Sequence, residues 1–261
     1  MPTPFIVAQI SDFHLFADPA ATLLEWPTEP SFRAVLEEAV ACEPDLLLIT
    51  GDLTQDGSPA AYRRIMSALE ETGIRYCCLP GNHDDPEIMR DLMSTPAGPE
   101  IHIERLSNWH LLMLDSHVEG ATHGRVHPDA IDQLNDVLDT LSQPVMIAVH
   151  HPPVKIGCKW IDGINLQRAA PLLDAVRSHP QVKLVLSGHV HQSFATSLGH
   201  AAIYTTPATS IQFKPGVDEF TLDDAAPGFR LVRLYSDGSH DSQVRRVPVS
   251  FAIDPTATGY E

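Results

Sequence analysis

The chain has few cysteines and no long hydrophobic run. Its 261 residues include four cysteines and no Cys-x-x-Cys pair, which argues against a disulfide scaffold and a zinc ribbon. No window approaches the roughly 18–20 apolar residues that a membrane-spanning helix needs. The N-terminus lacks the basic and apolar regions of a signal peptide. We therefore expect a cytoplasmic protein without a membrane partner.

Basic residues are also scarce. The chain holds 17 Lys and Arg against 34 Asp and Glu, which gives a formal net charge of −17. Without a basic run to neutralise a phosphate backbone, a nucleic-acid partner is not expected. An acidic chain can still bind a small anionic substrate where bound metal ions reverse the local field.

Hydrophobic periodicity predicts alternating strands and helices in the N-terminal part. Apolar runs predict buried strands at 5–10, 45–50 and 74–79, and helical spacing predicts helices at about 29–41 and 59–71. This order implies a parallel sheet with right-handed crossovers.

Shorter elements are expected in the second half. Apolar runs predict buried strands at 145–149 and 182–186. Residues 154–164 show no clean period and are predicted as a loop, in which Trp160 either packs in the core or stacks on a nucleobase. Short antiparallel strands are expected after 193, the last two joined by a hairpin turn at Asp237-Gly238.

We predict an α/β protein with two mixed sheets flanked by helices. No internal repeat or linker-like stretch interrupts the sequence. Residues 1–261 are therefore expected to form a single domain, with 207–261 as a C-terminal strand and tail extension packed on it.

Metal-ligand side chains directly follow five of the apolar strands. They are Asp12, His14, Asp52, Asn82, His83, Asp84, His150, His151, His189 and His191. Each has an ordinary explanation when taken singly, as a turn residue, a helix cap or an exposed pair. Their repeated position favours one shared site, because such folds place active sites at the carboxyl ends of parallel strands.

The ligand types indicate the class of metal. Asp, Asn and His without thiolate suit Fe, Mn, Zn or Co rather than a structural zinc. Seven candidate ligands are too many for one ion, whereas two ions that share Asp52 as a bridge have about four each. We expect two divalent ions, Fe²⁺ or Mn²⁺ ahead of Zn²⁺ or Co²⁺. Such a pair activates a bridging hydroxide for in-line attack on phosphorus.

The order of these motifs resembles the calcineurin-like metallophosphoesterase family. The motifs are Asp12-x-His14, Gly51-Asp52, Gly81-Asn82-His83-Asp84, His150 and Gly188-His189-x-His191. The resemblance implies a four-layer α/β/β/α sandwich. It also implies two ligand sets that share the bridge, one of Asp12, His14, Asp52 and His191, and the other of Asp52, Asn82, His150 and His189.

We expect different roles for His83, Asp84 and His151, which lie beside the candidate ligands. By resemblance His83 faces the substrate phosphate, where it joins Asn82 as a catalytic residue and stabilises charge or protonates the leaving 3′-oxygen. The alternative for His83 is to orient a ligand. We expect Asp84 to cap the next helix, and His151 either to orient a ligand or to face solvent.

Sequence blocks outside the metal motifs resemble bacterial class III 3′,5′-cyclic AMP phosphodiesterases (the CpdA type). They are Gln9–Phe16, His123-Gly124, Ala208–Pro215, Ala226–Arg230, and Asp254–Ala257 with Gly259-Tyr260. These blocks matter because metal motifs alone do not separate phosphodiesterases from phosphatases. We take the region around Gln212–Pro215 and the tail as the part that identifies the substrate.

This closer resemblance implies a monomer or homodimer that hydrolyses 3′,5′-cyclic AMP to 5′-AMP. The first alternative is a glycerophosphodiesterase, or a broad-specificity enzyme for small phosphodiesters and monoesters. The second is a metal-free binding scaffold of the same fold. The scaffold is disfavoured because scaffolds of this kind lose ligands first, and all seven candidate ligands are present.

Overall fold

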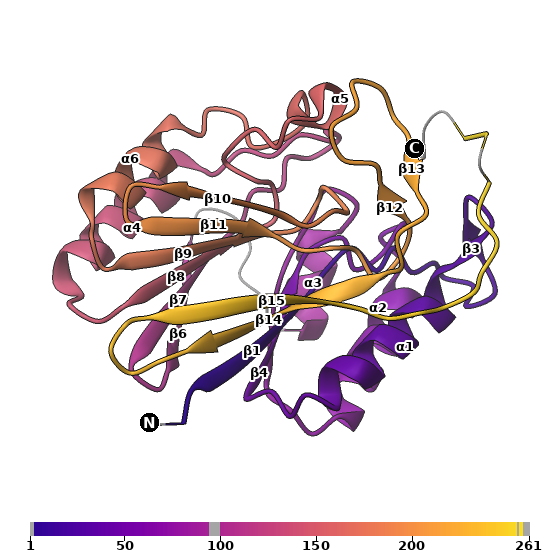
Figure 1. Cartoon of the computed structure of the whole chain (residues 1–261), viewed down its shortest axis with the longest axis horizontal. Coiled ribbons are helices and arrows are strands. Elements are labelled where there is room, and N and C mark those ends of the chain that lie inside the picture. The colour runs from indigo at the N-terminus through magenta and orange to yellow at the C-terminus, as the bar shows by residue number, and fades with distance from the viewer. Residues whose placement is uncertain (1–2, 94–99, 255, 258–261) are drawn as a thin grey trace.

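Two β-sheets packed face to face form the centre of the molecule (Figure 1). The computed structural model describes residues 3–93, 100–254 and 256–257. The first sheet has the strand order β15-β14-β1-β4-β5, and the second has the order β10-β11-β9-β8-β7-β6. Two short pairs, β2-β3 and β12-β13, lie outside these sheets.

The elements in chain order are β1 (Phe5–Ile10), β2 (Thr22–Leu23), β3 (Trp26–Pro27), α1 (Thr28–Val40), β4 (Leu46–Thr50), α2 (Pro59–Glu71), β5 (Tyr76–Leu79), α3 (Pro86–Met93), β6 (His102–Leu106), β7 (Trp109–Leu114), α4 (Pro128–Thr140), β8 (Val145–Val149), α5 (Lys159–Asp162), α6 (Ala170–Ser178), β9 (Val182–Ser187), β10 (Phe194–Leu198), β11 (Ala201–Thr205), β12 (Gln212–Phe213), β13 (Leu222–Asp223), β14 (Gly228–Leu234) and β15 (His240–Arg246).

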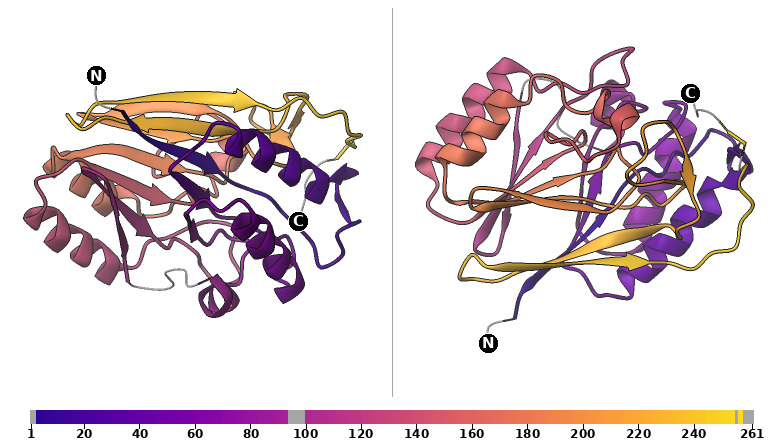
Figure 2. Two further views of the ribbon diagram at one scale, coloured as in Figure 1. Left: turned by 90° about the horizontal axis from the view of Figure 1, so that it is seen from below. Right: turned by 45° about the horizontal axis from the view of Figure 1, so that its top comes forward.

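Helices cover the outer faces of the sheets, so the molecule has four layers (Figure 2). Successive residues of a strand point to opposite faces. In β1, Ala8 packs in the cluster that contains residues of α1 and α2, whereas Val7 packs between the two sheets. Residues of α4 and α6 cover the other sheet. The α/β/β/α sandwich predicted from the sequence is thereby confirmed.

Parallel pairing aligns the strands that precede the polar loops. In the first sheet β1 pairs parallel with β4, and β4 with β5. In the second, β8 pairs parallel with both β7 and β9. The loops after β1, β4 and β5 therefore leave the same edge of one sheet, and those after β8 and β9 the same edge of the other.

Helix α2 follows the sequence prediction at both ends. Ser58 caps it, because its Oγ accepts a hydrogen bond from Ala61 N, and Pro59 occupies the first turn.

Two secondary-structure predictions in the second half of the chain were wrong. The expected loop at 154–164 contains the helix α5, a single turn too short to show a period. One late strand also departs from the antiparallel pattern, since β11 pairs parallel with β9.

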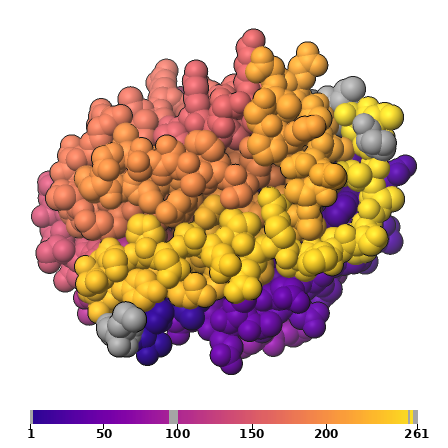
Figure 3. Space-filling model, viewed as in Figure 1, coloured from indigo at the N-terminus to yellow at the C-terminus, as the bar shows by residue number. Residues whose placement is uncertain are grey.

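The C-terminal part contributes two strands to the first sheet. Strand β14 pairs antiparallel with β1 and with β15, and the hairpin turn expected at Asp237-Gly238 joins β14 to β15. Figure 3 shows these residues across one face of the molecule. The division into one domain with a 207–261 extension stays a prediction. The expected tail block lies partly outside the described residues, which omit 255 and 258–261.

Within the described ranges, no helix combines the length and apolar character needed to cross a membrane.

Candidate metal centre

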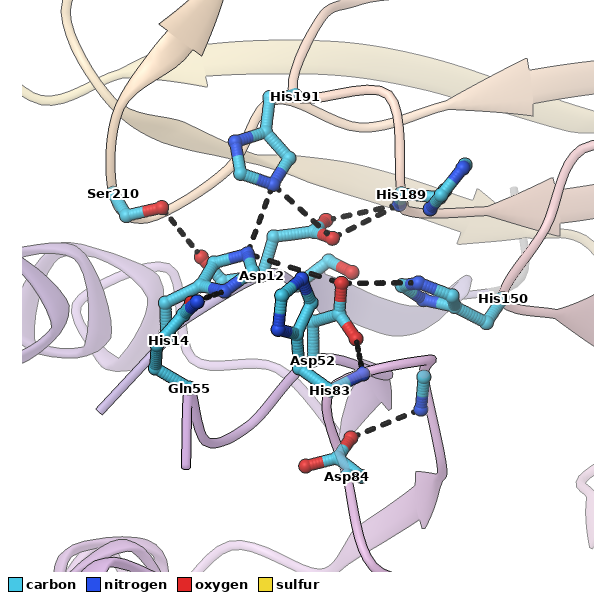
Figure 4. Close-up of polar contacts among 12 residues, drawn as sticks. Asp12, His14, Asp52, Gln55, His83, Asp84, His150, His189, His191 and Ser210 are labelled. Atoms are coloured by element: carbon cyan, nitrogen blue, oxygen red, sulfur yellow. Dashed lines mark hydrogen bonds and ion pairs between the residues drawn. The ribbon is translucent and has the colours of Figure 1, made fainter. Parts of the chain in front are cut away.

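Five loops bring six of the seven candidate ligands, together with His83, to one place between the sheet edges (Figure 4). Asp52 lies at the centre of this cluster. His14 and His150 approach it from different sides, with Nε2 atoms 3.8 Å and 3.3 Å from Asp52 Oδ2. All three side chains are fully buried. Charges and lone pairs this far from water are costly unless a partner satisfies them.

The loops carry an unusual backbone conformation. Five of the seven candidate ligands have positive φ without being glycine, namely Asp12 (59°), His14 (52°), Asp52 (51°), His189 (68°) and His191 (46°). Such conformations cost of order 1–3 kcal/mol each and cluster at functional sites. The chain therefore maintains strain where the candidate ligands converge.

Glycines permit the close approach of the loops. A Cβ on Gly51 would lie 2.3 Å from His150 Nδ1, and Gly51 also has a φ of +96°. A Cβ on Gly188 would lie 2.1 Å from Ser11 Oγ. Only glycine fits these positions, because any side chain would force the loops apart.

The first group of converging atoms comes from Asp12, His14 and His191, whose ligand atoms all lie within 4.8 Å of one another. The Nε2 atoms of the two histidines are 3.0 Å apart. His14 Nδ1 donates to Gln55 Oε1 at 2.7 Å and His191 Nδ1 donates to the Ile211 carbonyl at 2.9 Å. With both protons on Nδ1, two Nε2 lone pairs face each other, an arrangement that a cation resolves.

The second group of atoms lies around Asp52 and His150. His150 Nδ1 donates to the Thr50 carbonyl at 2.6 Å, which directs Nε2 toward Asp52. Nε2 lies 3.3 Å from Asp52 Oδ2, and these two residues form with Asp12 a group whose ligand atoms lie within 4.8 Å of one another. In the described part of the chain, the buried Asn82 Oδ1 is an acceptor without a hydrogen-bond donor, which fits a cation as its partner.

The protonation states of His14, His189 and His191 fit a role as metal ligands. Burial lowers the pKa of His189 and of His191 to about 3, and it holds the pKa of His14 well below its usual range. All three rings are therefore neutral at pH 7 and keep a lone pair for a metal ion.

The carboxylates and His150 titrate differently. Burial opposes the charged form of His150, but the Asp52 carboxylate outweighs it and raises the His150 pKa to about 9. Burial also opposes ionisation of Asp52, yet His150 and His83 hold the Asp52 pKa well below its usual range. Burial raises the pKa of Asp12 to about 7. A metal ion must therefore compete with protons on His150 and Asp12.

His189 lies at the other side of the cluster. Its backbone N–H donates to Asp12 Oδ1 at 2.9 Å. The ring nitrogens of His189, His150 and His151 form a separate group within 4.8 Å. His151 therefore lies next to two candidate ligands, as one of its two predicted alternatives requires.

His151 does not face solvent, so that alternative is wrong. It is fully buried. Its Nε2 donates to the Thr122 carbonyl at 3.3 Å, and Nδ1 then accepts from Ser116 Oγ at 2.8 Å. Both ring nitrogens are engaged by the protein, which leaves His151 to support the rings of His150 and His189, 4.7 and 4.5 Å away between centroids.

The expected cap of the helix after Asn82-His83-Asp84 was assigned to the wrong residue. Asp85 Oδ1 accepts from Glu87 N and Ile88 N and so caps α3. The Asp84 carboxylate instead accepts from Leu53 N, Thr54 N, Gly81 N and Tyr62 Oη. It therefore ties the loop after β4 to the loop after β5.

Sequence reasoning missed the residues that hold the ligands. Gln55 and Ile211 orient histidine rings, as described above. Gln9, next to the C-terminal end of β1, donates to Thr50 Oγ1 and to the Ser187 carbonyl, which joins the two sheets. Gln9 opens one of the blocks that carry the closer resemblance, and it is a polar residue inside an apolar strand, but neither signal gave it this role.

Comparison with known proteins supports the same family. Residues 5–193 match the family model described as calcineurin-like phosphoesterase. The chain is 36% identical over 258 residues to a 3′,5′-cyclic-nucleotide phosphodiesterase of Nostoc sp. (strain PCC 7120), covering 98% of this chain and 97% of that protein. It is also 36% identical over 263 residues to the 3′,5′-cyclic adenosine monophosphate phosphodiesterase CpdA of Pseudomonas aeruginosa, covering 98% and 95%.

Among solved structures, a dimetal phosphatase from Danio rerio shares the fold, with a TM-score of 0.67 and 16% identity over 95% of this chain and 100% of that one. The four-layer sandwich and the match of residues 5–193 to the family model define a metallophosphoesterase, a class that uses a dinuclear metal centre. This chain belongs to the calcineurin-like phosphoesterase family. Its predicted resemblance to bacterial cyclic AMP phosphodiesterases is confirmed by its curated relatives.

Proposed function

We propose that the protein is a dinuclear-metal phosphodiesterase that hydrolyses 3′,5′-cyclic AMP to 5′-AMP. The observation that carries the proposed substrate is the near full-length similarity to curated cyclic nucleotide phosphodiesterases. The proposed chemistry is supported by the buried cluster around Asp52, with the facing Nε2 atoms of His14 and His191 and the groups of ligand atoms that converge there.

The family resemblance implies two ligand sets, and we propose both. Asp12, His14, Asp52 and His191 hold one ion, and Asp52, Asn82, His150 and His189 hold the other. The donor atoms suit Fe²⁺ or Mn²⁺, with Zn²⁺ or Co²⁺ as alternatives. When bound, such a pair polarises a phosphoryl oxygen and lowers the pKa of water.

The protein's own residues prepare this chemistry. Gln55 and two backbone carbonyls fix the tautomers of His14, His191 and His150, so the Nε2 atoms point inward without rearrangement. Asn82 offers a neutral oxygen, which binds a cation without adding negative charge. The site therefore stays cationic enough to attract a phosphodiester to an acidic chain.

We propose that His83 acts on the substrate rather than on a metal ion. Its backbone N–H donates to Asp52 Oδ1 at 2.9 Å, and its half-buried ring lies edge-on to His14 with centroids 5.0 Å apart. From this half-buried position the ring can donate a proton to the leaving 3′-oxygen.

The cytoplasmic location and the monomeric or homodimeric state of the protein stay predictions.

A substrate panel tests the proposal. The Mn²⁺-loaded protein is assayed with 3′,5′-cyclic AMP, 3′,5′-cyclic GMP, a glycerophosphodiester and a phosphate monoester. The proposal expects the highest kcat/KM with cyclic AMP, and expects Asn82→Ala to lose most activity while it keeps its fold. A wide margin in favour of the glycerophosphodiester, or full turnover by the Asn82→Ala protein, contradicts it.

A further inference from the structure

We infer that the segment Thr209–Phe213 is a positioning strap for Asp12 and His191. The inference rests on the proposed function, because it takes these two residues as ligands of the first metal ion. The segment lies beyond residue 193, where the family match ends. It therefore belongs to the part of the chain that the shared family motifs do not cover.

The strap holds the His191 ring on two sides. The Phe213 ring stacks on it with centroids 4.2 Å apart and planes only 4° from parallel. The Ile211 carbonyl accepts the Nδ1 proton at 2.9 Å. Stacking limits tilt of the imidazole and the hydrogen bond limits its rotation, so together they fix where Nε2 points.

The same strap supports the backbone of the Asp12 loop. Ser210 Oγ donates to the Asp12 carbonyl at 2.9 Å, and Thr209 N donates to the Ser11 carbonyl at 3.0 Å. Asp12 has a φ of +59°, a conformation that persists only where surrounding contacts enforce it. Ser31 Oγ anchors the strap through the Thr209 carbonyl at 2.5 Å.

The strap is itself immobilised and removed from solvent. Ser210 and Phe213 are fully buried and Ile211 is 1% exposed. The Phe213 ring is held edge-on by Trp160 and Phe220, with centroids 5.0 and 5.5 Å away. This burial changes the interpretation of the block around Gln212–Pro215, because its aromatic residue supports a candidate ligand.

The test is the Mn²⁺ affinity of chelator-stripped protein, measured by calorimetric titration without substrate. We expect Phe213→Leu to weaken the tighter phase about tenfold, the lower end for residues that orient metal ligands. Phe229→Leu is the matched control, since Phe229 is equally buried but packs in the cluster behind the first sheet. It is expected to bind Mn²⁺ as the unmodified protein does.

A double-mutant cycle with His191→Ala separates positioning from general loosening. If the strap acts through His191, Phe213→Leu weakens binding in the unmodified protein but less than about twofold beside His191→Ala. Equal weakening in both backgrounds, or no weakening in a folded Phe213→Leu protein, overturns the inference.

Two further measurements keep the test decisive. Should Phe213→Leu fail to fold, Ser210→Ala removes only one hydroxyl, and it must weaken Mn²⁺ binding for the inference to stand. The number of ions bound reports separately on the proposed function. A protein that binds one ion or none contradicts the dinuclear assignment, whereas the affinity cycle judges the strap.

Discussion

His14 and His191 present their Nε2 atoms to each other at 3.0 Å although each ring has its proton directed elsewhere. Burial keeps both imidazoles neutral by lowering their pKa values. Two acceptor lone pairs at this distance repel each other in a buried site. A metal ion bound by both Nε2 atoms would use these lone pairs, and this links the ligand geometry to stability.

Metal removal should lower the stability of the folded protein. A ligand that binds only the native state stabilises it by about 2.7 kcal/mol at a free concentration 100 times its Kd. We expect the midpoint of thermal unfolding to rise when Mn²⁺ is added to stripped protein. His14→Ala should reduce that rise. A midpoint that does not respond to Mn²⁺ contradicts the ligand role of this pair.

Metal affinity should increase with pH. Without metal, the pKa of Asp12 is raised to about 7 and that of His150 to about 9, so both bind protons that a metal ion must displace at neutral pH. Affinity should rise as pH passes upward through these values. Calorimetry in two buffers of different ionisation enthalpy measures the protons released. Release of no protons at pH 7 is the opposing result.

The glycine at the turn after β4 should not tolerate alanine. At Gly51 a Cβ meets His150 and the backbone is left-handed, so we expect Gly51→Ala to lose about 2–5 kcal/mol of unfolding free energy from strain and overpacking together. Gly73→Ala is the matched control, because Gly73 also has positive φ but nothing within 4 Å of the added Cβ. It should lose only about 1–2 kcal/mol. Equal losses in denaturant titrations would show that crowding against His150 does not matter.

The carboxylate of Asp84 should contribute more to stability than that of Asp85. Asp84→Ala leaves several buried backbone N–H groups without their acceptor, and because each such group costs about 1–3 kcal/mol, we expect a loss of at least about 3 kcal/mol. Asp85→Ala removes a helix cap, worth about 1 kcal/mol. Urea unfolding of the two proteins compares them directly. The reverse order would show that the Asp84 contacts contribute less to stability than the helix cap at Asp85.

The strand positions and the convergence of the ligands could be predicted from the sequence for clear physical reasons. The apolar run at 45–50 suits a strand covered on both faces, and polar residues at the carboxyl ends of parallel strands lie at one edge of the sheet. The helix predicted at 59–71 likewise matches α2, because the spacing of its apolar residues is a local pattern. The four-layer arrangement was implied by the family resemblance.

The supporting contacts were beyond sequence reasoning because they join distant segments. Asp84 and Asp85 are adjacent carboxylates, and only the fold shows which one meets the loop after β4. The sequence left open whether His151 orients a ligand or faces solvent, and only the fold brings Ser116 and Thr122 to its ring. Positive φ at Asp12 leaves no mark in the sequence, since that conformation is imposed by neighbouring loops.

The most direct measurement of the central claim is the product of 3′,5′-cyclic AMP hydrolysis in ¹⁸O-labelled water, followed by ³¹P NMR with Mn²⁺-loaded protein. The account predicts 5′-AMP that carries one ¹⁸O on phosphorus, because water attacks phosphorus and the 3′-oxygen leaves. Cyclic AMP that stays intact while other phosphodiesters are hydrolysed, or 3′-AMP as the product, would contradict it.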